Sequence, residues 1–443
     1  MAVNPELPLE ERLVHLFHHL GIDQAHVAAR DAADWQGLVT AHPDRLASLT
    51  LVCPLALDPH VLQPLAARLL VVTGDEGPTA ARVRQWLTEI PGATSLILRA
   101  YASLGWSDMM AERTADIGTA LLEFLHRLEP RQPAPAVRLP AGEGEAAGLS
   151  YRIRGAGPPL VLFPLDLAPS QWEPLLPTLS AQYCTITLGG AAVGPVMFLE
   201  ARGRSGYLDV VHRLLRAVRV QPGETVLEVG CGSGVVVREL ARQTARANRL
   251  IGVDMNPYLL REAAGLARQA GLGDVITFRE GDAAALPFPD NSVDVTLACT
   301  VLEEGDADRM LAELVRVTRP GGRVGVIVRA TDMPAWVNLP LRADLKARLE
   351  APGLIGAGAS AQGCADASLY GRVQAVGLTS LTLFPQLDAV TPAEPRLARF
   401  QQQLLATLSP EDAQEWHRAV AHAQAQGTFF IAQPFHCAVG TKP

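Results

Sequence analysis

A glycine-rich turn between an apolar segment and a helical one constrains this chain more than any other feature. The apolar run 225–229 leads directly into Gly230-Cys231-Gly232-Ser233-Gly234. Asp254 stands 24 positions after Gly230, at the end of the apolar run 250–253. A strand, a glycine turn and a helix N-terminus let the backbone approach a ligand, and a carboxylate ending the next strand can accept both ribose hydroxyls. The pattern predicts a nucleoside site.

The spacing of the glycines separates two classes of nucleoside ligand. A dinucleotide fingerprint needs Gly-x-Gly-x-x-Gly, which leaves a helix N-terminus facing a pyrophosphate. Here the spacing is Gly-x-Gly-x-Gly, and Glu228 precedes the first glycine by two residues. A carboxylate at that place would repel a pyrophosphate but suits the ammonium group of a methionine moiety. The sequence therefore favours S-adenosylmethionine (SAM).

Four segments in order resemble the motifs of class I SAM-dependent methyltransferases, a family that includes the ubiquinone and menaquinone biosynthesis C-methyltransferases. They are residues 228–234, 252–254, 281–288 and 319–322. The resemblance extends over about residues 204–443 and implies a Rossmann-like α/β domain with SAM as cofactor. It places these residues against SAM: Glu228, Gly230, Cys231, Gly232, Gly234, Asp254, Met255, Asp282, Ala283 and Cys299.

The resemblance also implies roles for these positions. The helix expected over 234–243 offers its N-terminus to the methionine carboxylate. Asp254 accepts the ribose hydroxyls, Met255 lies on an adenine face, and Asp282 accepts the adenine amino group beside Ala283. Because no base stands beside Cys231 in the sequence, its thiol is expected to be passive.

Size and composition narrow the class of protein further. A chain of 443 residues should hold two or three domains. A net charge of −8 without a Lys/Arg cluster argues against a nucleic-acid partner. No apolar run reaches the length of a membrane span, and the acidic N-terminal residues do not resemble a secretory signal. The six scattered cysteines form neither a zinc motif nor a disulfide framework, which predicts a reducing, cytoplasmic location.

The region before the glycine turn resembles an α/β-hydrolase in permuted order. Residues 1–129 resemble the second half of that fold through segments 42–52 and 69–75, and residues 149–198 resemble the first half. A Pro-rich linker is expected over 130–148. The two halves could close into one sheet or pair with a partner subunit, and the sequence leaves both alternatives open.

The catalytic residues of a hydrolase are missing from this region. The family places its nucleophile in Gly-x-Ser-x-Gly, whereas residues 29–33 read Ala-Arg-Asp-Ala-Ala, with Asp31 at the nucleophile position. Segment 99–108 stands where the family's late histidine would be and contains none, and Phe163-Pro164 replaces the His-Gly pair that helps build the oxyanion hole. We therefore expect a non-catalytic domain.

The substrate side of residues 199–443 is less defined. Inserts are expected at 329–378, after the fifth strand, and at 386–427, between the sixth and seventh strands, where relatives roof their substrate pockets. Glu303 and His436 are weak candidates for a base, and Trp336, Asn338 and Tyr370 are candidate pocket residues. The absence of an Asn/Asp-Pro-Pro-Tyr motif and of a metal-ligand cluster favours O- or C-methylation of a small organic acceptor.

Two other functions stay open at this point. Asp31 could serve a hydrolase to which the SAM-binding domain is accessory, or the chain could be a SAM-binding scaffold or cyclase. A homodimer is an open alternative for the assembly.

Overall fold

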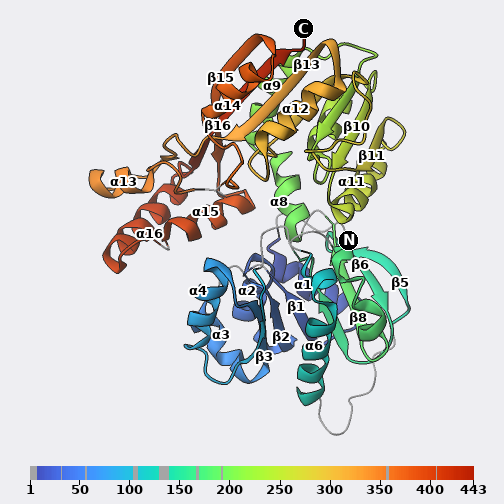
Figure 1. Cartoon of the computed structure of the whole chain (residues 1–443). Helices are drawn as coiled ribbons and strands as arrows, with labels where there is room; N and C mark the ends of the chain where they lie inside the picture. The colour runs from blue at the N-terminus through green and yellow to red at the C-terminus, as the bar shows by residue number, and fades with distance from the viewer. Residues whose placement is uncertain are drawn as a thin grey trace. The chain divides into compact units, whose positions relative to one another are not determined.

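The computed structural model describes residues 7–30, 32–54, 57–102, 108–128, 139–165, 169–190, 193–355, 359–405 and 407–443. Asp31 and residues 130–138 of the expected linker lie outside these ranges. The chain divides into two compact units, Met1–Met197 and Phe198–Pro443, next to the boundary predicted at residue 198 (Figure 1).

The first unit is built on one eight-stranded sheet with the order β4-β3-β2-β1-β7-β8-β6-β5. Its strands are β1 Ala25–Ala29, β2 Leu46–Val52, β3 Leu69–Gly74, β4 Thr94–Leu98, β5 Gly142–Ala146, β6 Leu149–Arg154, β7 Pro159–Leu162 and β8 Cys184–Gly189. β1 pairs in parallel with β7, and β6 is antiparallel to both β5 and β8. The two predicted halves therefore share one sheet within one chain, which decides between the two alternatives.

Helices cover both faces of this sheet, as expected for apolar parallel strands. One face carries α1 Leu9–Leu20, α2 Ala32–Ala41, α3 Pro59–Leu62 and α4 Gly77–Leu87. The other carries α5 Met109–Glu112, α6 Thr114–Leu128 and α7 Leu176–Ser180. Short 3-10 helices lie at Pro43–Arg45, Gln63–Arg68 and Pro169–Trp172.

The predicted linker over 130–148 is wrong at its C-terminal end, because β5 lies within it. Ala146 pairs with Leu149, so β5 and β6 form a hairpin with a two-residue turn. Both turn residues, Ala147 at φ 55° and Gly148 at φ 71°, have the positive φ that this kind of turn requires. The polar Gly-Glu-Gly-Glu segment is a strand because of this pairing, not because of its own propensity.

The second unit contains a sheet with the order β11-β10-β9-β12-β13-β16-β14, and β15 pairs with the other edge of β16. Its strands are β9 Thr225–Val229, β10 Arg249–Asp254, β11 Ile276–Glu280, β12 Val293–Cys299, β13 Thr318–Arg329, β14 Trp336–Val337, β15 Thr379–Val390 and β16 Ile431–Thr441. β16 is antiparallel to β13 and to β15. The chain runs from β9 to one edge of the sheet and later from β12 to the other, so the switch in strand order lies between β9 and β12, where such sheets bind ligands.

Helices also sandwich this second sheet. One face carries α9 Tyr207–Val218, α10 Val235–Gln243 and α11 Pro257–Gln269, and the other carries α12 Ala307–Val317 and α14 Ser368–Ala375. α8, Gly194–Arg202, precedes α9. None of the described helices is long and apolar enough to span a membrane.

The inserts form a lobe with a core of its own, seen beside the sheet in Figure 1. α13 Ala343–Leu349, α15 Pro395–Leu405 and α16 Pro410–Ala425 pack around Trp416, which is fully buried. The start predicted for the second insert, residue 386, is wrong. β15 stays paired with β16 as far as Val390 opposite Ile431, so the insert begins after Val390.

Candidate active site

The glycine turn joins β9 to α10 at the switch point of the second sheet. Gly230, Gly232 and Gly234 have φ of 68°, 52° and 79°, a backbone region that residues with a side chain rarely adopt. The amide of Cys231 donates to the carbonyl of Val253 on β10, over 2.9 Å. The turn is thus fixed to the neighbouring strand, and its conformation explains why the sequence has glycine at these three positions.

The space around the turn is as restrictive as its backbone. A Cβ atom at Gly230 would lie 2.2 Å from Val301 Cγ2, and one at Gly232 would lie 3.1 Å from Leu199 Cδ1. Both contacts come from segments that flank the carboxyl edge of the sheet. The turn 230–234, hereafter the cradle, therefore has glycine at positions 230 and 232 because of close packing as well as backbone conformation.

Asp254 ends β10 beside this cradle. Its Oδ2 accepts a hydrogen bond from the Gly232 amide at 2.8 Å, and its Oδ1 accepts one from the Asn256 amide at 3.0 Å. Burial raises the pKa of Asp254, against the lowering effect of these hydrogen bonds. The carboxylate thus lies between the glycine turn and the start of α11, at the position predicted for ribose recognition.

We expect Asp254→Ala to weaken SAM binding by roughly 1–3 kcal/mol, because charged acceptors of two hydroxyls would be lost. Calorimetric titration of SAM into both proteins measures the difference. Equal affinities would show that Asp254 does not hold the ribose.

Glu228 does not point into the opening of the turn. Its side chain is 2 % exposed, and its Oε2 accepts from the Val237 amide in the first turn of α10 at 3.0 Å. Burial, with a smaller contribution from the charge of Asp254, raises the pKa of Glu228 to about 8. A protonated carboxyl would not attract an ammonium group, so its predicted role depends on ionisation when ligand is bound.

This raised pKa makes stability depend on pH. The folded protein keeps a proton on Glu228 between its ordinary pKa of 4.5 and about 8, whereas the unfolded chain loses it. The free energy of unfolding should therefore fall as pH rises through this window, by up to roughly 1.4 kcal/mol per pH unit. In Glu228→Gln this decrease of the unfolding free energy should be absent. Urea denaturation near pH 5 and near pH 8 measures the unfolding free energy of both proteins. The same pH dependence of the unfolding free energy in wild type and Glu228→Gln would contradict this prediction. Glu280→Gln, at an exposed carboxylate, is the control and should keep the pH dependence of wild type.

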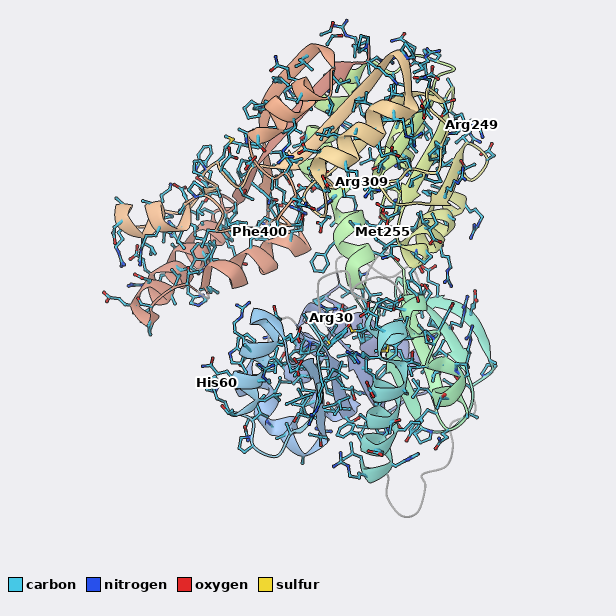
Figure 2. The ribbon with its side chains drawn as sticks, viewed as in Figure 1. Arg30, His60, Arg249, Met255, Arg309 and Phe400 are labelled. Carbon is cyan, nitrogen blue, oxygen red and sulfur yellow. The ribbon has the colours of Figure 1, made fainter. Side chains whose placement is uncertain are left out.

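The other predicted cofactor residues surround the same edge. Met255, which is labelled in Figure 2, has a side chain that is 73 % exposed. Asp282 is exposed, with Oδ1 accepting from the Ala284 amide at 2.8 Å beside Ala283. The amide of Gly281 donates to the Asp254 carbonyl at 3.1 Å, which brings the third motif next to the second.

All six cysteines are free and buried. Burial raises the pKa of Cys231 and of Cys299 well above the usual thiol value. Both thiols are therefore protonated at neutral pH, and neither is an activated nucleophile.

The end of α8 is a part of the site that sequence reasoning missed. Glu200 Oε1 accepts from Ser233 Oγ at 2.6 Å and is paired with Arg238, while Arg202 Nη1 donates to Thr300 Oγ1 at 3.0 Å. These few residues connect the glycine turn to the segment after β12. The only sequence signal was a pair of charged residues in an otherwise apolar helix.

The two candidate bases lie in different surroundings. Glu303 follows β12, is 1 % exposed, and accepts at Oε1 from the Arg329 amide at 2.8 Å. His436 is 4 % exposed; its Nε2 lies 2.8 Å from Asp332 Oδ1 and its Nδ1 lies 2.9 Å from the Tyr370 hydroxyl. The structure brings Glu303 to the switch point, whereas the hydrogen-bond partners of His436 lie after β13 and on α14.

The remaining candidate pocket residues, Trp336 and Asn338, make contacts within the insert lobe. Trp336 is 48 % exposed and contacts Phe430 edge to face at 5.7 Å. Asn338 Nδ2 donates to the Thr428 carbonyl at 2.7 Å. Both contacts tie the first insert to the segment before β16.

Residues 226–322 match the family described as "Methyltransferase domain". The chain is 31 % identical over 154 residues to the ubiquinone/menaquinone biosynthesis C-methyltransferase UbiE of Hahella chejuensis, which covers 31 % of this chain and 62 % of that protein. It is 37 % identical over 116 residues to the sterol 24-C-methyltransferase of Yarrowia lipolytica. That match covers 26 % of this chain and 30 % of the relative. It is 34 % identical over 146 residues to the nocamycin O-methyltransferase of Saccharothrix syringae. That match covers 32 % of this chain and 52 % of the relative.

The chain spans less than two thirds of the length of each of these relatives. The similarity falls on the sheet and glycine turn of the second unit, and the strand order there is that of a Rossmann-like α/β domain. The second unit therefore contains a class I SAM-dependent methyltransferase domain.

Proposed function

We propose that the chain transfers the methyl group of SAM to oxygen or carbon of a small organic acceptor. The observation that carries the proposal is the glycine cradle with Asp254 beside it at the switch point. When bound, SAM supplies an electrophilic methyl group with a neutral leaving group, so the protein contributes chiefly alignment and exclusion of water. The similarity to both C- and O-methyltransferases supports these two acceptor atoms.

The residues assigned to SAM are those that the sequence predicts. Gly230, Gly232 and Gly234 let the backbone approach the methionine moiety, and Asp254 receives the ribose. Met255 and Asp282 flank the adenine. Glu303 is the better base of the two candidates, because it is buried at the switch point, whereas His436 is held between Asp332 and Tyr370.

We further propose that the first unit is a non-catalytic scaffold of the α/β-hydrolase kind. The sheet that joins the two halves supports the fold, and the missing histidine argues against hydrolysis. The cytoplasmic location and the homodimer both stay predictions; sedimentation of the purified chain would test the second.

The test of methyl transfer uses SAM with a labelled methyl group and a panel of quinols, sterols and hydroxylated aromatic compounds. Label should appear in at least one organic product, with release of S-adenosylhomocysteine. Absence of SAM binding would overturn the proposal. Tight binding without transfer to any acceptor would favour the scaffold or cyclase.

A separate prediction concerns the first unit. We expect no burst of nitrophenol from an activated ester, and Asp31→Asn should leave SAM binding and methyl transfer unchanged. A nucleophile without a base and an oxyanion hole lacks several kcal/mol of transition-state stabilisation. A burst that disappears in Asp31→Asn would instead establish a hydrolase.

A further inference from the structure

The end of α8 covers the part of the cradle that we assign to the methionine moiety. Residues 231–234 are buried by the chain itself. Leu199 of α8 provides part of this cover, since its Cδ1 would lie 3.1 Å from a Cβ atom at Gly232. Where α8 ends, a Cβ atom at Gly203 would lie 2.9 Å from Val235 Cγ1, at the start of α10. α8 therefore packs directly on the backbone that would have to contact the ligand.

A charged pair holds α8 in this position. Both carboxylate oxygens of Glu200 accept from Arg238 Nη2, at 2.7 and 2.5 Å, and Oε1 also accepts from Ser233 Oγ at 2.6 Å. The side chain of Glu200 is 13 % exposed and that of Arg238 is 6 % exposed. Little water competes for this pair, so its attraction is stronger than that of a surface ion pair. Glu200 thus ties α8 to a residue of the glycine turn and to a residue of α10.

The adenine side of the assigned site is open by comparison. Met255 is 73 % exposed, and Asp282 is exposed as well. The contacts of Leu199 and Glu200 fall on residues 232–238, which belong to the methionine side of the assignment. In this conformation the adenine side is accessible, whereas the chain itself fills the methionine side.

The chemistry of Glu200 indicates what can displace it. The methionine moiety of SAM carries a carboxylate, which is the group that Glu200 presents to Arg238 and to the Ser233 hydroxyl. A ligand carboxylate that replaced Glu200 would satisfy the same two donors. Arg238 would then keep an anionic partner, so the exchange leaves no buried cation unpaired.

We propose that Leu199 and Glu200 hold α8 in an autoinhibitory position. In this position Glu200 takes the place of the methionine carboxylate, and SAM binds only after the end of α8 has moved away. The inference rests on the proposed function. The affinity measured for SAM is then lower than the affinity of the open form, by the fraction of molecules that are open.

Glu200→Gln tests this proposal, because it keeps the size of the side chain and removes its charge. Arg238 loses its anionic partner in the closed form but gains the ligand carboxylate when SAM binds. The variant should therefore bind SAM about tenfold more tightly than wild type, with the gain in the association rate constant. Surface plasmon resonance on the immobilised full chain measures the two rate constants.

Two controls accompany this variant. 5′-Methylthioadenosine lacks the amino and carboxyl groups of methionine, so its affinity should be the same in wild type and Glu200→Gln. Glu239→Gln, on the same helix, removes a contact with His212 Nε2 at 2.9 Å, away from the glycine turn. It should bind SAM as wild type does.

An engineered disulfide provides the reverse experiment. Cβ atoms at positions 203 and 235 lie within reach of a disulfide, so Gly203→Cys with Val235→Cys should fix the end of α8 to α10. The oxidised form should bind SAM at least about 100-fold more weakly than the reduced form, because it cannot open. 5′-Methylthioadenosine should bind both forms equally.

The possible failures are distinguishable. Unchanged or weaker SAM binding in Glu200→Gln would overturn the inference. Equal SAM affinity of the oxidised and reduced forms of the cysteine variant would overturn it as well. If neither wild type nor Glu200→Gln bound SAM or 5′-methylthioadenosine, the proposed function itself would be wrong.

Discussion

Gly232→Val should abolish detectable SAM binding, with a loss of at least about 100-fold, and leave the fold largely intact. The residue has φ +52°, and a Cβ there would lie 3.1 Å from Leu199 Cδ1. A β-branched side chain would therefore strain the turn and press against Leu199 at once, which would distort the cradle. Calorimetry with SAM and far-ultraviolet circular dichroism measure the two effects.

Gly271→Val is the matched control for this variant. Gly271 has a similar φ of +69°, but no atom lies within 4 Å of its Cβ position. Backbone strain alone should therefore cost stability at this site without affecting SAM. If Gly232→Val bound SAM as wild type does, the cradle would not be the cofactor site.

Removal of residues 1–128 should make the rest of the chain aggregate. The deletion takes away β1 to β4 and leaves the edge of β7 unpaired, since Val27 and Val161 are register partners in the sheet. It also opens the apolar cores on both faces, to which α1 and α6 contribute fully buried residues. Exposed strand edges and apolar surface favour association between chains.

The soluble fraction and the elution volume on gel filtration measure this outcome. Val161→Asp, at a fully buried position of β7, should have the same effect without shortening the chain. Glu143→Ala on β5 removes an exposed side chain that pairs with Arg152, and it should be tolerated. A soluble, monodisperse chain without residues 1–128 would contradict the shared sheet.

Local patterns predicted the elements around the cofactor site well. The strand over 225–229, the end of the next strand at Asp254 and the helix after Gly234 have the predicted positions within one residue. Each is set by a buried apolar run that ends at a glycine or a polar residue, which is a signal carried by adjacent residues.

Contacts between distant residues could not be predicted in the same way. Arg202 meets Thr300 across 98 positions, and His436 meets Asp332 across 104. These pairs form only when the fold brings the end of α8 and the segment after β13 next to residues far away in the sequence. β5 was missed for a related reason, because its polar sequence is a strand only through the pairing with β6.

Amide hydrogen exchange with and without SAM tests the central claim most directly, because it locates the cofactor on the chain. SAM should slow exchange at residues 229–234 and at 252–256, where the glycine turn and Asp254 lie, and leave β1 to β4 unchanged. If saturating SAM left amide exchange in these two segments unchanged, or slowed exchange only in the first unit, the assignment of the cofactor site to the glycine turn would be wrong.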